Sequence, residues 1–351
     1  MTQSTLQKAN ERLSNIELLR IIAMTLVLVV HADSFSLGCP QDATSINSIT
    51  RMVFQCLAVT CVDIFVLISG WFGINPTIKG AAKYLFQWLF FSIGIYVCMT
   101  LWGHIPFNKE GFTNCFIFNI GGYWFVGSYL ILYFLSPVLN AGINNIKREQ
   151  LKWIIIIFFL FQSIFSWCFL HSEFAHGYST ISFIGLYLLA RYIKIYQPSF
   201  INYKRIYYLI TFGGLILLNT VFLGIAIFLH RGGIPTRIMM FYDTPTTIMA
   251  SLALLLFFSK LDIRSRFVNW IASSCFAVYL LHTHYLLLGK YADIVRHLYD
   301  TYYGVKTLIM IGAFIILTFM ISIIIDQIRK VMWNITWFFI SNRCKEVNKQ
   351  T

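Results

Sequence analysis

The segment Glu17–His31, with the sequence ELLRIIAMTLVLVVH, is an apolar stretch that nevertheless carries Glu17, Arg20 and His31. At about 100° per residue, an α-helix returns at His31 to within about 20° of the face occupied by Arg20, and Glu17 lies within about 60° of it. One stripe of this helix therefore carries a carboxylate and a guanidinium near one end and an imidazole about 16 Å further along. Ionisable groups inside a membrane are costly and by default mark a functional path.

The whole chain has the composition of a polytopic membrane protein. Of its 351 residues, 58% are hydrophobic and 12% are charged, whereas a soluble domain has about 25% charged residues. The net charge of +13 does not indicate nucleic-acid binding, because the basic residues lie in short loops between apolar segments. No small-residue cleavage site follows the first apolar segment, so we expect a retained helix and not a removed signal peptide. The cysteines lack zinc-ligand spacing, so no metal site is expected.

Ten apolar segments are expected to cross the membrane in one helical bundle, which predicts an all-α fold. They are Asn15–Phe35, Ile49–Ile74, Ala81–Gly103, Gly122–Gly142, Leu151–His171, Tyr178–Tyr196, Ile206–His230, Tyr242–Ser259, Phe267–Leu288 and Val305–Ile328. A further apolar run, Val331–Ile340, is too short to span and is expected to lie along the membrane interface. This divides the chain into a cytoplasmic N-terminal segment (residues 1–15), an integral-membrane domain (residues 16–330) and an interfacial or cytoplasmic tail (residues 331–351).

The distribution of basic residues predicts the orientation of the bundle. Ten spans place both termini on one side, and most Lys and Arg residues fall in loops on that same side. The opposite side has only Arg51, Lys109, Arg231, Arg237, Lys290, Arg296 and Lys306. Because cytoplasmic loops carry the excess of Lys and Arg, both termini are expected in the cytoplasm. Arg20 then lies toward the inner side of the first helix and His31 toward the outer side.

Four stretches, in order along the chain, resemble the integral-membrane acyltransferase-3 family. The spacing of Arg20 and His31 is similar to that of a basic residue and an essential His in the opening helix of this family. CVDIFVLISGWF at Cys61–Phe72 resembles its second-helix stretch, and YWFVGSYLILYFLSP at Tyr123–Pro137 resembles its aromatic helix. SSCFAVYLLHTHYL at Ser273–Leu286 is similar to its late Ser-x-x-x-Tyr-Leu-x-His helix, with Cys275 where that pattern has Ser.

The resemblance implies a transferase that moves an acyl group, usually acetyl from cytoplasmic acetyl-CoA, onto a hydroxyl. The implied acceptor is a sugar of a surface polysaccharide or its lipid-linked precursor, and the implied location is a bacterial inner membrane. The O-acetyltransferases without an extra extracytoplasmic domain are the most similar. Acetyl-CoA is expected as donor substrate and no bound cofactor is expected. A transporter, flippase or polymerase of a polysaccharide pathway is the alternative, since such proteins are also basic, aromatic and many-spanned.

Acyl transfer to a hydroxyl needs a base, and His31 is the predicted general base. Two roles are open for Arg20: it grips a CoA phosphate or the thioester region, or it pairs with Glu17 or Asp63 so that the helix can insert. Asp63 either orients His31 or Arg20 or forms a structural ion pair. Glu17 is grouped with the donor site through its proximity to Arg20.

The remaining candidates each have a structural alternative. Ser69 with Gly70 is either an acyl carrier or a packing site for a neighbouring helix. Lys79 and Lys83 either meet CoA phosphates, replacing an Arg-rich loop that many family members carry, or simply follow the positive-inside rule. The others are predicted acceptor residues. Tyr123, Trp124 and Tyr129 either stack against a sugar ring or belong to the aromatic belt. Arg231 and Arg237 either bind an acidic sugar or lipid pyrophosphate or meet lipid headgroups. His282 either helps to bind the acceptor or forms part of the site. His284 is expected at the interface.

The orientation can be tested with a tag at the C-terminus. The tag should be accessible to an impermeant reagent only after the inner face of the membrane is opened, because both termini are expected in the cytoplasm. A tag that reacts in intact cells would contradict the orientation.

Overall fold

The computed structural model describes residues 13–117, 123–169, 174–230 and 233–347, and these residues form helices and turns without a β-strand. The first half contains α2 (Ser14–Val30), η1 (His31–Phe35), α3 (Ile46–Ala58), α4 (Cys61–Phe72), α5 (Ile78–Leu101), α6 (Lys109–Asn114), α7 (Trp124–Asn145), α8 (Arg148–Phe161) and η2 (Gln162–Cys168). The second half contains η3 (Ala175–Gly177), α9 (Thr180–Tyr196), η4 (Ser199–Asn202), α10 (Arg205–Phe228), α11 (Ile234–Met240), α12 (Pro245–Ser259), α13 (Arg266–Ala272), α14 (Cys275–His282), α15 (Leu288–Thr301) and α16 (Val305–Val347).

The predicted all-α, polytopic fold is confirmed. Among the described residues, 8 helical stretches are long and apolar enough to cross a membrane, compared with the ten that the sequence predicts. Two predicted spans account for the difference. The sixth is α9, which has 17 residues, and the ninth is divided into the short helices α13 and α14. The chain is thus a multi-pass membrane protein; the side on which its termini lie stays a prediction.

Hydroxyl side chains accompany the helix breaks inside the bundle. Between α3 and α4, Thr60 donates to the carbonyl of Leu57 at 2.8 Å, and Ser251 donates to the carbonyl of Thr60 at 3.2 Å. Between α13 and α14, Ser273 donates to the carbonyl of Trp270 at 2.6 Å. A broken helix is tolerated at membrane depth only where its freed backbone groups find such partners. These Thr and Ser hydroxyls therefore satisfy backbone carbonyls at the breaks.

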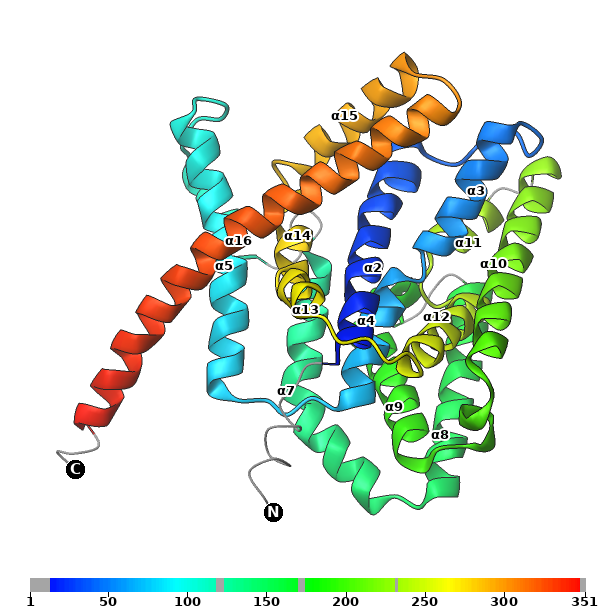
Figure 1. Cartoon of the computed structure of the whole chain (residues 1–351), viewed down its shortest axis with the longest axis horizontal. Helices are drawn as coiled ribbons and strands as arrows, with labels where there is room; N and C mark the ends of the chain where they lie inside the picture. The colour runs from blue at the N-terminus through cyan, green and yellow to red at the C-terminus, as the bar shows by residue number, and fades with distance from the viewer. Residues whose placement is uncertain (1–12, 118–122, 170–173, 231–232, 348–351) are drawn as a thin grey trace.

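Helix α16 is longer than predicted. It continues without interruption from Val305 to Val347, a length of 43 residues, so the run Val331–Ile340 is not a separate element. No proline follows Val305 to stop the helix, and Trp333 stacks on Trp337 one turn later, with ring centroids 5.4 Å apart. In Figure 1, α16 crosses the bundle diagonally and its C-terminal end projects beyond the other helices.

Helix α2 lies inside the bundle. It packs against α4 and α3 on one side and against α13 and α14 on the other (Figure 1). Many of its side chains are buried, and the outer faces of α8, α10 and α16 instead carry exposed apolar side chains, as lipid-facing helices do. The ionisable residues that the first segment carries are therefore enclosed by other helices.

Gly70 sets the distance between α4 and α9. A Cβ atom at this position would lie 2.6 Å from the carbonyl oxygen of Tyr187 and 2.8 Å from the Cβ of Ala190. Small residues allow such close backbone approach between membrane helices. Because α4 also carries Ser69 and Phe65 toward α2, this contact positions one wall of the site described below.

We therefore predict that Gly70→Ala lowers the unfolding midpoint in detergent, since the added methyl group forces α4 and α9 apart at a cost of about 1–3 kcal/mol. Gly213→Ala is the matched control, because a Cβ on this helical glycine of α10 meets no heavy atom within 4 Å. Equal midpoints for the two variants would contradict the packing role of Gly70.

Candidate acyl-transfer site

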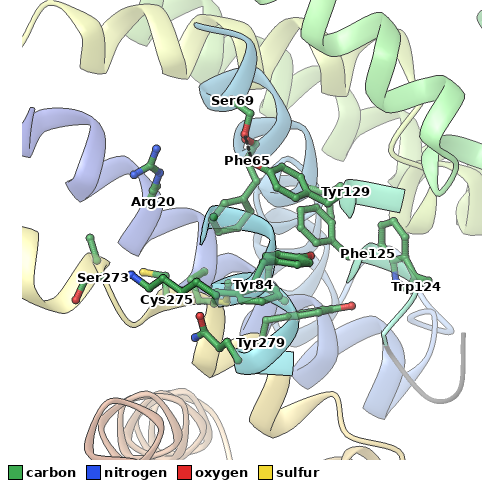
Figure 2. A pocket seen from close by; sticks show the side chains of 18 of the residues that line it. Arg20, Phe65, Ser69, Tyr84, Trp124, Phe125, Tyr129, Ser273, Cys275 and Tyr279 are labelled. Atoms are coloured by element: carbon green, nitrogen blue, oxygen red, sulfur yellow. Dashed lines mark hydrogen bonds between the residues drawn. The ribbon is translucent and has the colours of Figure 1, made fainter. Parts of the chain in front are cut away.

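A cavity of about 360 Å³ runs along one stripe of α2. Arg20, Met24, Val27 and His31 line it from this helix, at positions that recur on one helical face. Helices α4, α5, α7 and α14 supply most of the other walls, and Figure 2 shows their side chains around the same space. The helix face that carries Arg20 and His31, predicted from the sequence, thus forms one wall of a cavity. The two residues lie at different positions along the length of this cavity.

The cavity has two chemically different ends. Arg20, Lys83 and Ser273 lie toward the end where α2 begins, and His31 and Trp124 lie toward the other. Its volume is near the lower limit of ordinary ligand pockets, which are about 300–1,000 Å³. Since Arg20 and His31 are about 16 Å apart along the helix, the space is long and narrow. It suits an extended chain better than a bulky ring system.

Aromatic side chains form the middle of the cavity. Tyr84 stacks on Phe276 with ring centroids 4.8 Å apart, and Phe125 stacks on Tyr129 at 5.6 Å. Figure 2 shows Phe125 and Tyr129 on one side of this space and Arg20, Ser273 and Cys275 on the other. Tyr84, Phe125 and Tyr279 line the cavity. Phe125 and Tyr279 lie in the stretches Tyr123–Pro137 and Ser273–Leu286, whereas the sequence analysis did not single out Tyr84.

His31 is hydrogen-bonded to His282, although the two residues are 251 positions apart. The Nδ1 atom of His31 lies 3.0 Å from the Nε2 atom of His282, and Nδ1 of His282 lies 2.6 Å from the carbonyl oxygen of Val278. His282 is buried, at 2% exposure, at the end of α14. The sequence suggested that His282 contacts the acceptor, whereas in the structure its polar atoms bind His31 and the backbone.

This chain of hydrogen bonds fixes the tautomers of both neutral imidazoles. A carbonyl oxygen only accepts, so Nδ1 of His282 carries the proton and its Nε2 carries a lone pair. Nδ1 of His31 must then donate to that lone pair. The Nε2 atom of His31 is left with the lone pair, which is the form a general base needs.

The backbone is widened where His31 lies. Residues His31–Phe35 form the π-helical turn η1, and the hydroxyl of Ser36 donates to the carbonyl of His31 at 2.5 Å. π-Turns inside α-helices occur frequently at functional sites. This turn is also the point where α2 ends, so His31 lies on the last part of a rigid helix and next to an irregular segment.

At the opposite end, Arg20 is paired. Its Nη1 lies 2.5 Å from Oε1 of Glu17, one turn earlier on α2. The Glu17 side chain is almost completely buried, whereas 31% of the Arg20 side chain is exposed. The pair that the sequence suggested is present, and it leaves part of the Arg20 side chain accessible in the cavity wall. Lys83 of α5 lines the same end.

A polar network from α16 reaches this end and was not recognised in the sequence. Lys330 donates to Ser273 at 2.7 Å and to Ser274 at 2.9 Å, and its Nζ lies 3.3 Å from Oδ2 of Asp326. Arg329 binds the same carboxylate at 2.8 Å and is buried at 1% exposure. Because Ser273 lines the cavity, the network joins α16 to its wall. The Ser-Ser pair before α14 was the only local sequence signal.

Ser69 lies in the cavity wall, but its hydroxyl is engaged. It donates to the carbonyl of Phe65 at 3.0 Å and lies 3.1 Å from the hydroxyl of Tyr129. Its neighbour Gly70 packs against α9. The contacts of Ser69 are those of a packing site, and no histidine is among them.

Other predicted site residues lie outside the cavity wall. Lys79 lies over the Trp337 ring at 5.2 Å, and Tyr123 donates to the carbonyl of Leu280 at 2.6 Å. Arg237, on α11, is half-buried away from the cavity. Asp63 is completely buried and lies near Ser251 and Asp243 instead of His31 or Arg20. Arg231 lies outside the described residues.

His284, which was expected at the membrane interface, is enclosed by protein. This residue is completely buried, and its Nε2 lies 3.2 Å from the carbonyl of Ser92 on α5. Helix α14 ends at His282, so the chain turns there and His284 folds inward where a continuing helix would have carried it elsewhere. Among the described residues, no cluster of His, Cys, Asp and Glu side chains fits a metal ion.

A comparison with known protein families shows which family this chain belongs to. The profile of the acyltransferase 3 family, described as an acyltransferase domain, matches residues 13–327, which is nearly the whole chain. The chain belongs to the acyltransferase 3 family. The match covers every helix that lines the cavity. The protein is therefore a membrane acyltransferase, which implies an acyl donor and an acceptor. No curated protein and no solved structure matched the chain.

Proposed function

We propose that this acyltransferase moves an acetyl group from cytoplasmic acetyl-CoA to a hydroxyl of a surface-polysaccharide sugar or its lipid-linked precursor, in a bacterial inner membrane. The observation that carries the proposal is the His31–His282 pair at one end of a narrow cavity whose other end carries cationic side chains. The family match over residues 13–327 favours this function over a transporter or polymerase.

The donor end fits the body of an acyl-CoA. A cavity of about 360 Å³ has room for the narrow pantetheine arm but not for the nucleotide as well, so the nucleotide stays at the mouth. There Arg20 and Lys83 line the wall, and Lys330 donates a hydrogen bond to Ser273, which also lines it. Guanidinium and ammonium groups are the usual partners of phosphates. The arm then extends past the aromatic rings toward His31.

The chemistry requires one proton to move from acceptor to donor. Nε2 of His31 takes the proton of the acceptor hydroxyl while its oxygen forms a bond to the thioester carbon. The carbon–sulfur bond then breaks, and the protonated His31 returns the proton to the CoA sulfur. The products are an acetyl ester and CoA thiol. Throughout, Nδ1 of His31 donates to His282, which holds the ring in one orientation as the third group of a catalytic triad does.

Arg20 and His31 act on different parts of the donor. They are about 16 Å apart along a rigid helix, so they cannot contact the same atom. Arg20 therefore binds the body of acetyl-CoA, held in position by Glu17, and His31 acts at the reacting carbon. Asp63 takes no part in orienting either residue and supports α4 from within the bundle.

His31→Ala should reduce transfer of label from acetyl-CoA to surface glycan by about 10²–10⁴-fold, the usual contribution of a general base, at unchanged protein level. His297→Ala is the matched control, because His297 is an exposed histidine of α15 and lies outside the cavity. Full transfer by His31→Ala would contradict the proposal.

The role of His282 can be separated from acceptor binding in the same assay. His282→Gln should lower kcat and leave KM for the acceptor nearly unchanged, because the residue orients His31 and does not touch substrate. A raised acceptor KM at unchanged kcat would instead return His282 to the acceptor site that the sequence suggested.

A further inference from the structure

A second, larger cavity lies on the opposite face of α2. It is a groove of about 730 Å³ between α2, α3 and the first turns of α16, and we call it the α16 groove. From α2 it is lined by Thr25, Val29 and Ala32, whereas the first cavity is lined by Met24, Val27 and His31. The two spaces therefore run along opposite sides of one helix and approach each other at η1.

Most of the α16 groove is apolar and adjoins lipid. Phe54 of α3 and Ile311, Ile315 and Ile316 of α16 line it. Exposed apolar residues continue outward from its rim: Phe54 is 45% exposed and Ile316 is 61% exposed. A groove with such walls at membrane depth takes a hydrocarbon chain.

The end of the groove at η1 is polar and has the chemistry of a hydroxyl-binding site. Asp33, Arg51, Tyr299 and Asp300 lie there. Carboxylates accept hydrogen bonds from sugar hydroxyls, and tyrosine rings offer flat faces for stacking. The Oδ2 atom of Asp33 is buried and has no hydrogen-bond partner within the described part of the chain. This atom is an acceptor that a bound hydroxyl can satisfy after a small rearrangement.

A phospholipid headgroup fits this end less well. Arg51 is the cation in the lining, and it is already engaged. Its Nε lies 2.5 Å from Oδ1 of Asp33, its Nη2 donates to the carbonyl of Gly38, and its guanidinium lies over the Tyr299 ring at 5.7 Å. With Asp300 also in the lining, the charge at this end does not favour a phosphate. The walls favour a lipid whose headgroup carries neutral hydroxyls.

We propose that the α16 groove holds the hydrocarbon chain of a glycolipid whose sugar lies at Asp33, beside the turn that carries His31. His31 lines the first cavity and Asp33 lines the groove, two positions apart in the same five-residue π-turn, so the two spaces reach this turn from different sides. This inference rests on the proposed function. It narrows the two acceptors named there to a membrane lipid with a sugar head and assigns the groove as the place where its hydrocarbon chain binds.

Gly312 gives a sharp test, because it lines the groove and a Cβ there would meet no heavy atom within 4 Å. Gly312→Phe should fill the groove. Gly94→Phe is the matched control: it places the same side chain on a helical glycine of α5 that is equally open and lies outside the groove. Protein extracted with its surrounding membrane should retain a glycolipid, found by mass spectrometry, in the wild type and in Gly94→Phe. In Gly312→Phe the retained amount should fall by at least about tenfold.

The same measurement on His31→Ala separates the groove from catalysis. This variant should retain the glycolipid although it cannot acylate it. Retention without any acyl transfer by the wild type would overturn the proposed function and leave the groove assignment standing. Equal retention in Gly312→Phe and Gly94→Phe, or retention of phospholipid alone, would overturn the groove assignment.

A photo-crosslinking residue keeps the test decisive if Gly312→Phe does not fold. Ile316 and Ile324 lie on α16 and are similarly exposed, at 61% and 63%, but only Ile316 lines the groove. Benzoylphenylalanine at position 316 should capture a glycolipid, and at position 324 it should capture bulk phospholipid. The same products at both positions would contradict the assignment.

Discussion

The hydrogen bond between His31 and His282 is the interaction on which the site depends. It joins the end of α2 to the end of α14 across a buried interface, at 3.0 Å, and the carbonyl of Val278 completes the chain at 2.6 Å. Because the carbonyl of Val278 only accepts, Nδ1 of neutral His282 donates to it, Nδ1 of His31 donates to Nε2 of His282, and the basic lone pair falls on Nε2 of His31. The rest of the bundle holds these two helix ends together, through the packing of α2 against α14, α13 and α4.

Helix α2 then acts as a partition with a different space on each face. One face carries Arg20 and His31 along a narrow cavity with a cationic end, and the other borders a wide apolar groove. Both spaces include a residue of η1, the π-turn that follows α2: His31 lines the first and Asp33 lines the second. Under the proposed function, the anionic donor would enter along one face of α2 and the membrane-bound acceptor along the other. Both would then reach the turn that carries His31 and Asp33.

Much of this arrangement could be predicted from the sequence because it is local. The common face of Arg20 and His31 follows from helix geometry alone, and the all-α fold follows from the apolar segments. The contacts that complete the site are not local. His31 meets His282 across 251 positions, Lys330 reaches Ser273 across 57, and Asp63 lies near Asp243 instead of Arg20. The pairing of these residues depends on how the helices pack, which the periodicity of apolar residues in the sequence does not encode. The positions at which the helices end, at His282 and near Ser273, also depend on contacts with other helices.

The central claim is that acyl transfer runs along α2 from a cytoplasmic donor end to an acceptor at His31. It is tested most directly with sealed membrane vesicles of defined orientation, given labelled acetyl-CoA on one side only. The account predicts that label reaches the acceptor only when acetyl-CoA is on the cytoplasmic side, and that His31→Ala abolishes this transfer. Equal labelling from either side, or labelling that persists in His31→Ala, would contradict it.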